Sequence, residues 1–424
     1  MKKLKKKLNV LYKNFSWTFS GNIVYALSQW GIIVLLAKIG TVEMVGQFSL
    51  GLALSAPIIL FFNLQLNSIV ATDTSNQNSF GVYFGSRIVY LMLAIIFIVL
   101  ITTISNYDQE LTWIIILVGL SKVFESLSEL THGYMQKIER MDFVGKSQMI
   151  KGVISLLTVY LCLLLTQSLI ISLISLILVW FLRLVSYDLR NLRKFTAIRP
   201  IFNSEMRQLF VFALPLGIVS LLNSLNSNIP RYFLENYVGI EELGYYAAIV
   251  YMLVAGNLLI KPLSLVVAPR LANYYNSNNF KSFLKLNFLL LLISLIIGLI
   301  LITIVIFMGE WILKIVYGPN YIEYHLVFII VMIGSTLSFF TTFLNISIVA
   351  ARAFKIQPFV NVITTIVTII SSFLIIPSQG VTGAALVLII TFSTQFFGSL
   401  LIFIYILYFQ EKPGEKDAKI TNKK

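Results

Sequence analysis

The stretch DLRNLRKFTAIRPIFNSEMR, which runs from Asp188 to Arg207, is the longest markedly polar interval between hydrophobic blocks of the chain. It lies near the middle of the sequence and carries five basic residues against two acidic ones. A net-basic connection between apolar spans is typical of the cytoplasmic side of a membrane. We therefore interpret this stretch as a cytoplasmic linker between two halves, and this assignment orients all the other segments.

The composition of the chain indicates a membrane protein. Of its 424 residues, 58% are hydrophobic and only 12% are charged, and the mean hydropathy is +0.87. A soluble protein of this length would be expected to be about a quarter charged. The formal net charge of +14 could indicate nucleic-acid binding, but the basic residues lie in short loops between apolar stretches, not in a folded basic patch with aromatic readers. We therefore expect no nucleic-acid partner.

Stretches of about 20 apolar residues are long enough to cross the hydrocarbon layer of a membrane. The first half contains six of them, at residues 15–36, 46–66, 88–104, 113–134, 149–165 and 169–187. The second half contains six more, at residues 210–229, 245–267, 288–307, 327–350, 359–376 and 381–408. They predict an all-α polytopic membrane protein with two six-helix bundles, at residues 1–187 and 208–409. The linker at 188–207 and a basic cytoplasmic tail at 410–424 complete the chain.

The basic residues are distributed unevenly between the two ends of these spans. Assuming that both termini are cytoplasmic, the basic residues on the outer side are Lys38, Arg231 and Lys314, and those within the spans are Lys122, Lys151 and Lys261. All the others, including Arg87 and Arg183, belong to inner connections or to the termini. The positive-inside rule predicts this bias for an even number of spans with both termini inside. The basic amino terminus is then expected to be a retained anchor of the first span.

An internal repeat relates the two halves. After the first span the chain reads GTVEMVGQFS from Gly40, and after the seventh it reads GIEELGYYA from Gly239. With one deletion, both segments present a glycine, an acidic residue, a second glycine and an aromatic residue two positions later. Because each half has an even number of spans, the two copies should point the same way and be related by an axis along the membrane normal.

The sequence contains no signature of an ATP-driven motor, a hydrolase or a metal enzyme. The triplet Gly145-Lys146-Ser147 lacks the upstream glycine that a phosphate-binding loop requires. His132 and His325 are the only histidines, and the chain has neither an HExxH nor a GxSxG motif. The single cysteine, Cys162, excludes an intramolecular disulfide. We expect no catalytic residue, metal or cofactor, so transport would be driven by a gradient or run downhill.

The fourth span carries a set of ionisable residues. They are Lys122, Glu125, Glu129 and His132. Their spacing places them on one helical stripe, which should face protein or water because an unpaired charge at mid-bilayer costs about 2.5 to 3.5 kcal/mol. One interpretation is that Lys122 binds a diphosphate or an acidic sugar while Glu125 or Glu129 exchanges a proton. The alternative is a structural i, i+3 ion pair of Lys122 with Glu125, with Glu129 and His132 merely near the cytoplasmic interface.

Other polar residues are further candidates. Lys261 precedes a proline in the eighth span, where it could meet a phosphate or equally extend toward the headgroups. Asn223 and Asn226 lie on a polar stripe of the seventh span and could hydrogen bond to sugar hydroxyls or to neighbouring helices. We expect Lys151 to extend its ammonium toward the headgroups and Arg87 to anchor the third span at the inner interface.

Short motifs recur along nearly the whole chain. They are Asn22 in the first span, the turns Gly46-Gln-Phe48 and Gly244-Tyr-Tyr246, ALPLG at 213–217, YMQKIERM at 134–141, and Lys261-Pro262 through Pro269-Arg270-Leu271. This set is similar to that of the polysaccharide and O-antigen repeat-unit flippases of the multidrug/oligosaccharidyl-lipid/polysaccharide exporter (MATE-like) superfamily. The two extra carboxyl-terminal spans of the lipid II flippase branch are not found.

This resemblance implies two six-helix bundles around a V-shaped cavity that opens alternately to each side. It implies a flippase that moves a polyprenyl-diphosphate-linked oligosaccharide across the bacterial cytoplasmic membrane, for capsule, O-antigen or another surface polysaccharide. Expected partners are this lipid-linked oligosaccharide, membrane lipids, and a polymerase and glycosyltransferases of the same pathway. Two alternatives remain open: a cation-coupled drug exporter of the same fold, whose cavity should be rich in acids, and a membrane polysaccharide polymerase or ligase, which should carry a sizeable outer loop.

Overall fold

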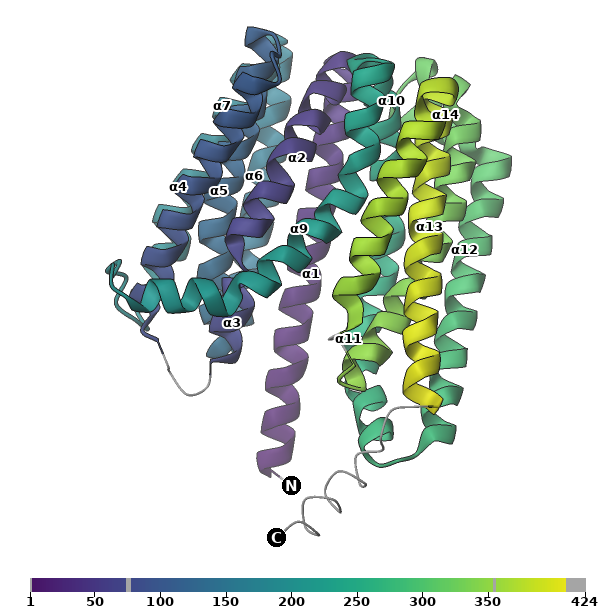
Figure 1. Ribbon diagram of the computed structural model, residues 1–424. Helices are drawn as coiled ribbons and strands as arrows, with labels where there is room; N and C mark the ends of the chain where they lie inside the picture. The colour runs from purple at the N-terminus through teal and green to yellow at the C-terminus, as the bar shows by residue number, and fades with distance from the viewer. Residues whose placement is uncertain (1, 74–77, 354–355, 409–424) are drawn as a thin grey trace. The chain divides into compact units, whose positions relative to one another are not determined.

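The structure is a computed structural model, and it describes residues 2–73, 78–353 and 356–408 (Figure 1). These residues form helices and their connections, and no β-strand occurs among them. A helix suits a bilayer because it satisfies the backbone N–H and C=O groups within its own segment. The predicted all-α membrane architecture is confirmed.

The chain divides into two compact units. The first unit extends to Glu235 and also includes Gly239–Ala248, while the second consists of Asn236–Val238 and the described residues from Ile249 onward. Helix α9 (Glu205–Tyr237) is held to the first unit by side-chain hydrogen bonds, such as that from Gln65 Nε2 to Ser220 Oγ at 3.0 Å. The boundary between the compact units therefore lies later in the chain than the linker predicted at residues 188–207. The division into two six-helix halves at this linker stays a prediction.

The first unit is built around one central helix. Its helices are α1 (Lys2–Lys38), α2 (Val42–Asn63), α3 (Leu66–Thr72), α4 (Phe80–Ile104), α5 (Gln109–Lys137), α6 (Met141–Thr166), α7 (Leu169–Arg183), the π-helical segment η1 (Leu184–Leu189), α8 (Arg190–Leu192), α9 and the start of α10 (Ile240–Tyr251). Helix α5 contacts α2, α3, α4, α6 and α7, and α1 packs along α6. Polar side chains on α5 therefore meet protein on most sides, and lipid contact is left to the outer helices.

The second unit contains long helices and one short 3₁₀ segment. They are α11 (Leu253–Asn276), α12 (Phe280–Val316), the 3₁₀ segment η2 (Pro319–Tyr324), α13 (His325–Ala350) and α14 (Gln357–Tyr408). Helix α13 packs against α11, α12 and α14. Helix α14 is interrupted at Gly380, whose φ of 55° and ψ of −130° are not helical. Glycine adopts this conformation without the strain that a Cβ would add, so α14 consists of two membrane-length segments.

The membrane spans agree with the sequence-based prediction. Among the described residues, ten helices are long and apolar enough to cross a membrane. One of them is α14, which the break at Gly380 divides where the prediction separated residues 359–376 from 381–408. The predicted span at 245–267 corresponds to α10 and α11, which are separated at Met252. Each predicted span is therefore helical, although neither α10 nor α11 is among the ten membrane-length helices found in the described residues.

The two glycine turns of the predicted repeat contact each other reciprocally. A Cβ at Gly46 would lie 1.9 Å from the backbone oxygen of Ile240, and a Cβ at Gly244 would lie 2.2 Å from the backbone oxygen of Val42. Gly46 of α2 thus packs against the first turn of α10, and Gly244 of α10 packs against the first turn of α2. Only glycine permits backbones to approach this closely. The reciprocal contact gives the predicted repeat a physical basis.

Candidate functional site

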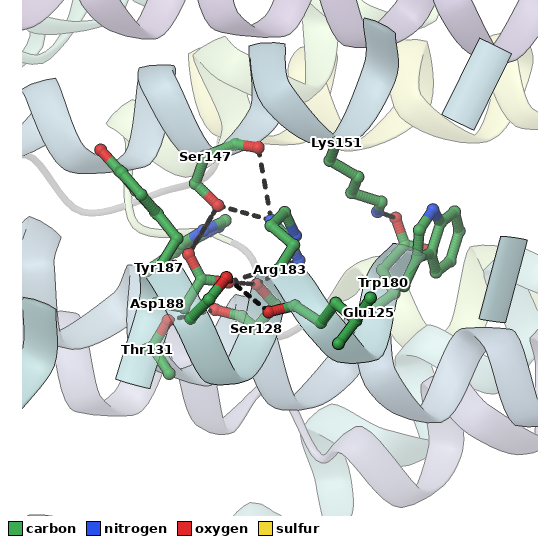
Figure 2. Close-up of polar contacts among 12 residues, drawn as sticks. Glu125, Ser128, Thr131, Ser147, Lys151, Trp180, Arg183, Tyr187 and Asp188 are labelled. Carbon is green, nitrogen blue, oxygen red and sulfur yellow. Dashed lines mark hydrogen bonds and ion pairs between the residues drawn. The ribbon is translucent and has the colours of Figure 1, made fainter. Parts of the chain in front are cut away.

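The ionisable stripe of α5 lies at the centre of the first unit. Helix α5 begins at the N-cap Asp108, whose carboxylate accepts a hydrogen bond from the Leu111 backbone N–H at 3.0 Å. Such a cap satisfies one of the unpaired N–H groups at the start of the helix. Further along α5, the stripe meets side chains of α1, α6 and the α7–η1 helix. Those of α6 and of the α7–η1 helix are labelled in Figure 2. We call the resulting group of side chains the buried cluster. Its members are Tyr25, Lys122, Glu125, Ser128, Glu129, His132, Ser147, Lys151, Trp180, Arg183 and Asp188.

Glu125 of α5 is the centre of the first half of the buried cluster. Its carboxylate accepts hydrogen bonds from Lys122 Nζ at 2.7 Å, from Lys151 Nζ and from the Tyr25 hydroxyl. The ammonium of Lys151 also donates to Tyr25 Oη at 2.9 Å. The Lys151 side chain is 4% exposed, whereas that of Lys122 is 22% exposed. One carboxylate therefore serves two ammonium groups, and the more deeply buried of them belongs to Lys151.

Trp180 of α7 forms the apolar wall of this half. The Lys151 ammonium lies 3.9 Å from the centroid of the Trp180 ring, and that of Lys122 lies 5.4 Å from it. The indole N–H donates to Ser155 Oγ at 2.8 Å, which fixes the orientation of the ring. An aromatic face attracts a cation most strongly where water is excluded. Trp180 therefore stabilises the lysines as cations inside the bundle.

Asp188 is the centre of the second half of the buried cluster. Its carboxylate accepts hydrogen bonds from Ser147 Oγ at 2.6 Å and from Ser128, and it lies 3.3 Å from Arg183 Nη2. The guanidinium of Arg183 also donates to the hydroxyls of Ser147 and Ser128, at 2.5 Å each. Figure 2 shows Ser147 and Lys151 projecting from the same helix, one toward each half of the cluster. Helix α6 thus joins the two halves.

The π-helical segment η1 is the reason why Arg183 and Asp188 can pair. They are five positions apart along the chain, and in a regular α-helix this spacing points two side chains to different sides. A π-helix has i→i+5 hydrogen bonds, which bring positions five apart onto one face. The chain is π-helical over Leu184–Leu189. Asp188, the first residue of the predicted linker, therefore lies within the helical bundle and is 4% exposed.

Ser147, His132 and Asp188 lie together but do not form a hydrolytic triad. His132 Nε2 is 3.1 Å from Ser147 Oγ and 3.7 Å from the nearest Asp188 oxygen. A triad requires the two ring nitrogens to serve opposite partners, one facing the serine and the other the carboxylate. Here a single nitrogen faces both, and the serine hydroxyl already donates to Asp188. The geometry is that of a structural hydrogen-bond network.

Arg87 of α4 packs against α5. Its side chain is completely buried, and Nη1 donates to Ser126 Oγ at 2.8 Å. Ser126 in turn donates to Asn63 Oδ1. In the part of the chain that the structure describes, Arg87 Nε and Nη2 have no hydrogen-bond partner. Glu129 is its electrostatic neighbour on α5.

The structure corrects two sequence-based interpretations of lysine and arginine. Lys151 does not extend toward the headgroups, because its ammonium is bonded to Glu125 and Tyr25 inside the bundle. Arg87 does not anchor the third span at the interface, because it is buried against α5. Arg183, counted among the inner basic residues, is likewise 4% exposed. In each case the cation has partners on other helices, which the linear sequence does not reveal.

None of the other predicted site residues contributes a described contact to the buried cluster. On α9, Asn223 is exposed and Asn226 is 2% exposed, so the two do not share one environment. Lys261 belongs to α11, and its side chain lies outside the described residues. Neither helix contributes a residue to the cluster described above. Lys122, Glu125 and Glu129 are the predicted residues that the structure brings together, and Lys122 and Glu125 form the ion pair of the alternative interpretation.

Cations outnumber carboxylates among these buried groups. The cations are Arg87, Lys122, Lys151 and Arg183, and the carboxylates are Glu125, Glu129 and Asp188. Counted with a neutral His132, they carry one net positive charge. In the described residues, no group of three or more His, Cys, Asp or Glu side chains could hold a metal ion. Together with Arg87, the buried cluster therefore carries a small excess of positive charge.

Comparison with known proteins identifies the family. A family model described as polysaccharide biosynthesis protein matches residues 11–275. The capsular polysaccharide biosynthesis protein CapF of Staphylococcus aureus is 31% identical over 384 residues, which cover 90% of this chain and 96% of that protein.

Solved structures share the fold at low sequence identity. The lipid II flippase MurJ in an inward closed conformation has a TM-score of 0.72 and 13% identity, covering 92% of this chain and 89% of that chain. An inward-facing multidrug resistance MATE family transporter has a TM-score of 0.70 and 10% identity, covering 90% and 93%. The chain therefore shares the helical fold of these two polytopic membrane proteins. The chain belongs to the polysaccharide biosynthesis protein family.

Proposed function

We propose that this protein is a flippase that moves a polyprenyl-diphosphate-linked oligosaccharide from the cytoplasmic to the outer leaflet of the bacterial cytoplasmic membrane. The observation that carries the proposal is the combination of a transporter fold with membership of a polysaccharide biosynthesis family. Polysaccharide synthesis across a membrane needs a step that carries a large polar head group through the hydrocarbon layer. That passage is costly unless protein replaces the water around the polar groups.

The transport cycle that we propose is alternating access. Both termini would lie in the cytoplasm, as the distribution of basic residues predicts. The lipid-linked oligosaccharide would come from glycosyltransferases, and a polymerase would extend it on the outer side. The reciprocal glycine contact between α2 and α10 offers a close pivot for motion, because it brings backbone against backbone, with only the Val42 and Ile240 side chains beside the glycines.

Within the buried cluster, we assign different roles to the two glutamates of α5. Glu125 is bound by two ammonium groups and a phenol, so it has a fixed set of partners. Glu129 is partly exposed and forms no ion pair among the described residues, although Arg87 and Lys151 are its electrostatic neighbours. A proton can reach such a carboxylate without breaking an ion pair. Glu129 is therefore our candidate for ion coupling, and Glu125 holds the cluster together.

We assign the cargo contact in this unit to Lys122, since it is the more exposed of the two lysines. Asn223, exposed on α9, is our candidate for contacts with sugar hydroxyls, and Asn226 and Lys261 remain further candidates. A cation-coupled drug exporter is the second candidate function. Its cargo would be cationic and would be repelled by the net positive charge of the buried groups, so the anionic cargo is favoured.

The decisive experiment is deletion of the gene in its host, complemented with wild-type protein or with Glu129→Gln. We expect the deletion to abolish surface polysaccharide and to leave lipid-linked oligosaccharide in the cytoplasmic leaflet, where added glycosidase cannot reach it in intact spheroplasts. Wild-type protein should restore export. Unchanged surface polysaccharide in the deletion strain would reject the proposal. Increased sensitivity to cationic drugs with normal polysaccharide would favour the exporter.

A further inference from the structure

A cavity of about 730 Å³ lies within the second unit, between α11, α13 and the start of α14. Its volume falls within the range of about 300 to 1,000 Å³ that is usual for small-molecule sites. The polar residues that line it are Asn276, Thr342, Asn345, Arg352 and Gln357. No acidic residue is among the lining residues, and Arg352 supplies the positive charge. The polar part of the cavity therefore suits an anion.

Arg352 occupies a backbone position that usually belongs to glycine. Helix α13 ends in a Schellman motif, in which Arg352 N–H donates to Val349 O at 2.9 Å and Ala353 N–H donates to Ile348 O at 3.0 Å. Arg352 lies at the left-handed position of this motif, with a φ of 59°. A residue with a Cβ is strained there relative to glycine. The capping geometry thus does not explain the choice of arginine, whereas its guanidinium lines the cavity.

The amides of the cavity present donors. Asn345 Oδ1 accepts hydrogen bonds from Gln357 Nε2 at 3.2 Å and from Ser399 Oγ at 2.9 Å. Since its oxygen is occupied in this way, the Asn345 amide offers its N–H groups to a ligand. Arg352 is exposed and forms no ion pair within the described ranges. An uncommitted guanidinium beside amide N–H groups is a suitable arrangement for phosphate oxygens.

The remaining wall is apolar and continues to the protein surface. Ala268 and Ala272 of α11 and Ile346 and Val349 of α13 form this wall. Val349 is 55% exposed, so the apolar wall reaches the surface of the unit. A free inorganic anion gains nothing from such a wall, whereas a lipid chain attached to a phosphate does.

We propose that this cavity binds the phosphate end of an isoprenoid lipid phosphate, with the diphosphate on Arg352 and the first isoprene units along the apolar wall. This inference rests on the proposed function, because it makes the cavity a site for the lipid carrier of the oligosaccharide. The site belongs to the second unit alone and is separate from the buried cluster of the first. Arg352 is among the basic residues that the positive-inside rule places on the cytoplasmic side, where the cargo is taken up.

The test is equilibrium binding of fluorescently labelled farnesyl diphosphate to the purified full-length protein in detergent micelles. We expect Arg352→Gly to weaken binding at least about tenfold, the usual order for loss of a charge-assisted hydrogen bond. Glycine is preferred at this position, so the variant should melt at the same or a higher temperature than the wild type. Arg352→Lys, which keeps the charge, should bind with intermediate affinity.

Arg270→Ala is the matched control, because Arg270 is an exposed cation of α11 that does not line the cavity. It should bind farnesyl diphosphate as the wild type does. Inorganic pyrophosphate should compete at least about tenfold more weakly than unlabelled farnesyl diphosphate, because it cannot use the apolar wall. Phosphatidylglycerol in nanodiscs should not compete.

The outcomes separate this inference from the proposed function. Wild-type binding by Arg352→Gly would overturn the site, and so would equal competition by pyrophosphate or by phosphatidylglycerol. The same variants are then tested for restoration of surface polysaccharide in the deletion strain. If export depends on the protein but Arg352→Gly binds and exports normally, the site is wrong and the flippase function stands. If deletion leaves export unchanged while Arg352→Gly loses binding, the function is wrong and the site stands.

Discussion

Replacement of Lys151 tests the central claim about the buried cluster, that this lysine is an internal ion-pair partner. Removing one member of a buried ion pair costs about 3 to 5 kcal/mol, because the other charge remains buried. Lys122 would still neutralise part of the Glu125 charge, so we expect Lys151→Met to lower the free energy of unfolding by about 3 kcal/mol, the lower end of that range. The cation–π contact with Trp180 is lost in the same substitution.

Lys122 and Lys146 provide graded controls. The Lys122 side chain is 22% exposed, so water compensates for part of its charge, and Lys122→Met should cost about 1 kcal/mol. Lys146 is exposed on the same helix as Lys151, and Lys146→Met should change stability by less than about 0.5 kcal/mol. The expected order of destabilisation is therefore Lys151, then Lys122, then Lys146.

The assay is reversible unfolding of the purified protein in mixed micelles, followed by circular dichroism as the denaturing detergent is increased. The double variant Lys151→Met/Glu125→Gln should lose less stability than the two single variants together, because neither member of this pair is then left buried without the other. Lys122 loses its partner both in Glu125→Gln and in the double variant, so its contribution cancels in the comparison. If Lys151→Met costs no more than Lys146→Met, the ammonium is solvated or reaches the headgroups, and the cluster described above is not a stabilising unit.

Three further predictions follow from the same geometry. Gly46→Ala and Gly244→Ala should sharply reduce the amount of folded protein in membranes, because the added Cβ would lie 1.9 Å and 2.2 Å, respectively, from a backbone oxygen. Gly31→Ala should be tolerated, because its Cβ would meet only the flexible end of the Leu156 side chain. Immunoblotting of membrane fractions measures all three variants. Arg183→Met should lower the free energy of unfolding by about 3 to 5 kcal/mol, and adding Asp188→Asn should recover much of this loss. Arg190 is exposed, so Arg190→Met should be neutral. Additive losses in the double variant would contradict the pairing of Arg183 with Asp188. Glu129→Gln should reduce polysaccharide export while the amount of protein in the membrane stays normal. Glu125→Gln should instead reduce the amount of folded protein, because Glu125 binds both lysines. Normal export by Glu129→Gln would show that Glu129 has no part in ion coupling.

The stripe of α5 shows how far sequence reasoning reaches into the site. Helical spacing places Lys122, Glu125 and Glu129 on one face, and the structure has them there. The same spacing suggests the ion pair of Lys122 with Glu125, which is present at 2.7 Å. Tyr25 and Trp180 were not predicted, because an aromatic residue in an apolar span has no feature that separates packing from a cation contact. The sequence signal that could have directed attention to them was the presence of two lysines, Lys122 and Lys151, within predicted spans.

The amino-acid sequence alone determined the class of the protein and its membrane spans, and it predicted an internal repeat. These properties depend on the composition and order of residues within single segments, because the bilayer selects each span by its own hydropathy and length. The family motifs are likewise local. The break in α14 at Gly380 and the glycine turns at Gly46 and Gly244 follow from the same local information, since glycine is the residue that tolerates such backbone geometry.

Only the tertiary structure decided which buried charges are partners. Lys151 meets Glu125 because α6 packs beside α5, and Arg183 meets Asp188 because the helix between them is π-helical. Such pairs depend on how helices cross and on their rotational register, and residues far apart in sequence set both. A buried charge is stable only beside an opposite charge or a hydrogen-bond partner, so the packing of the first unit, and not the position of a lysine along its span, determines whether that lysine faces lipid or pairs inside the protein.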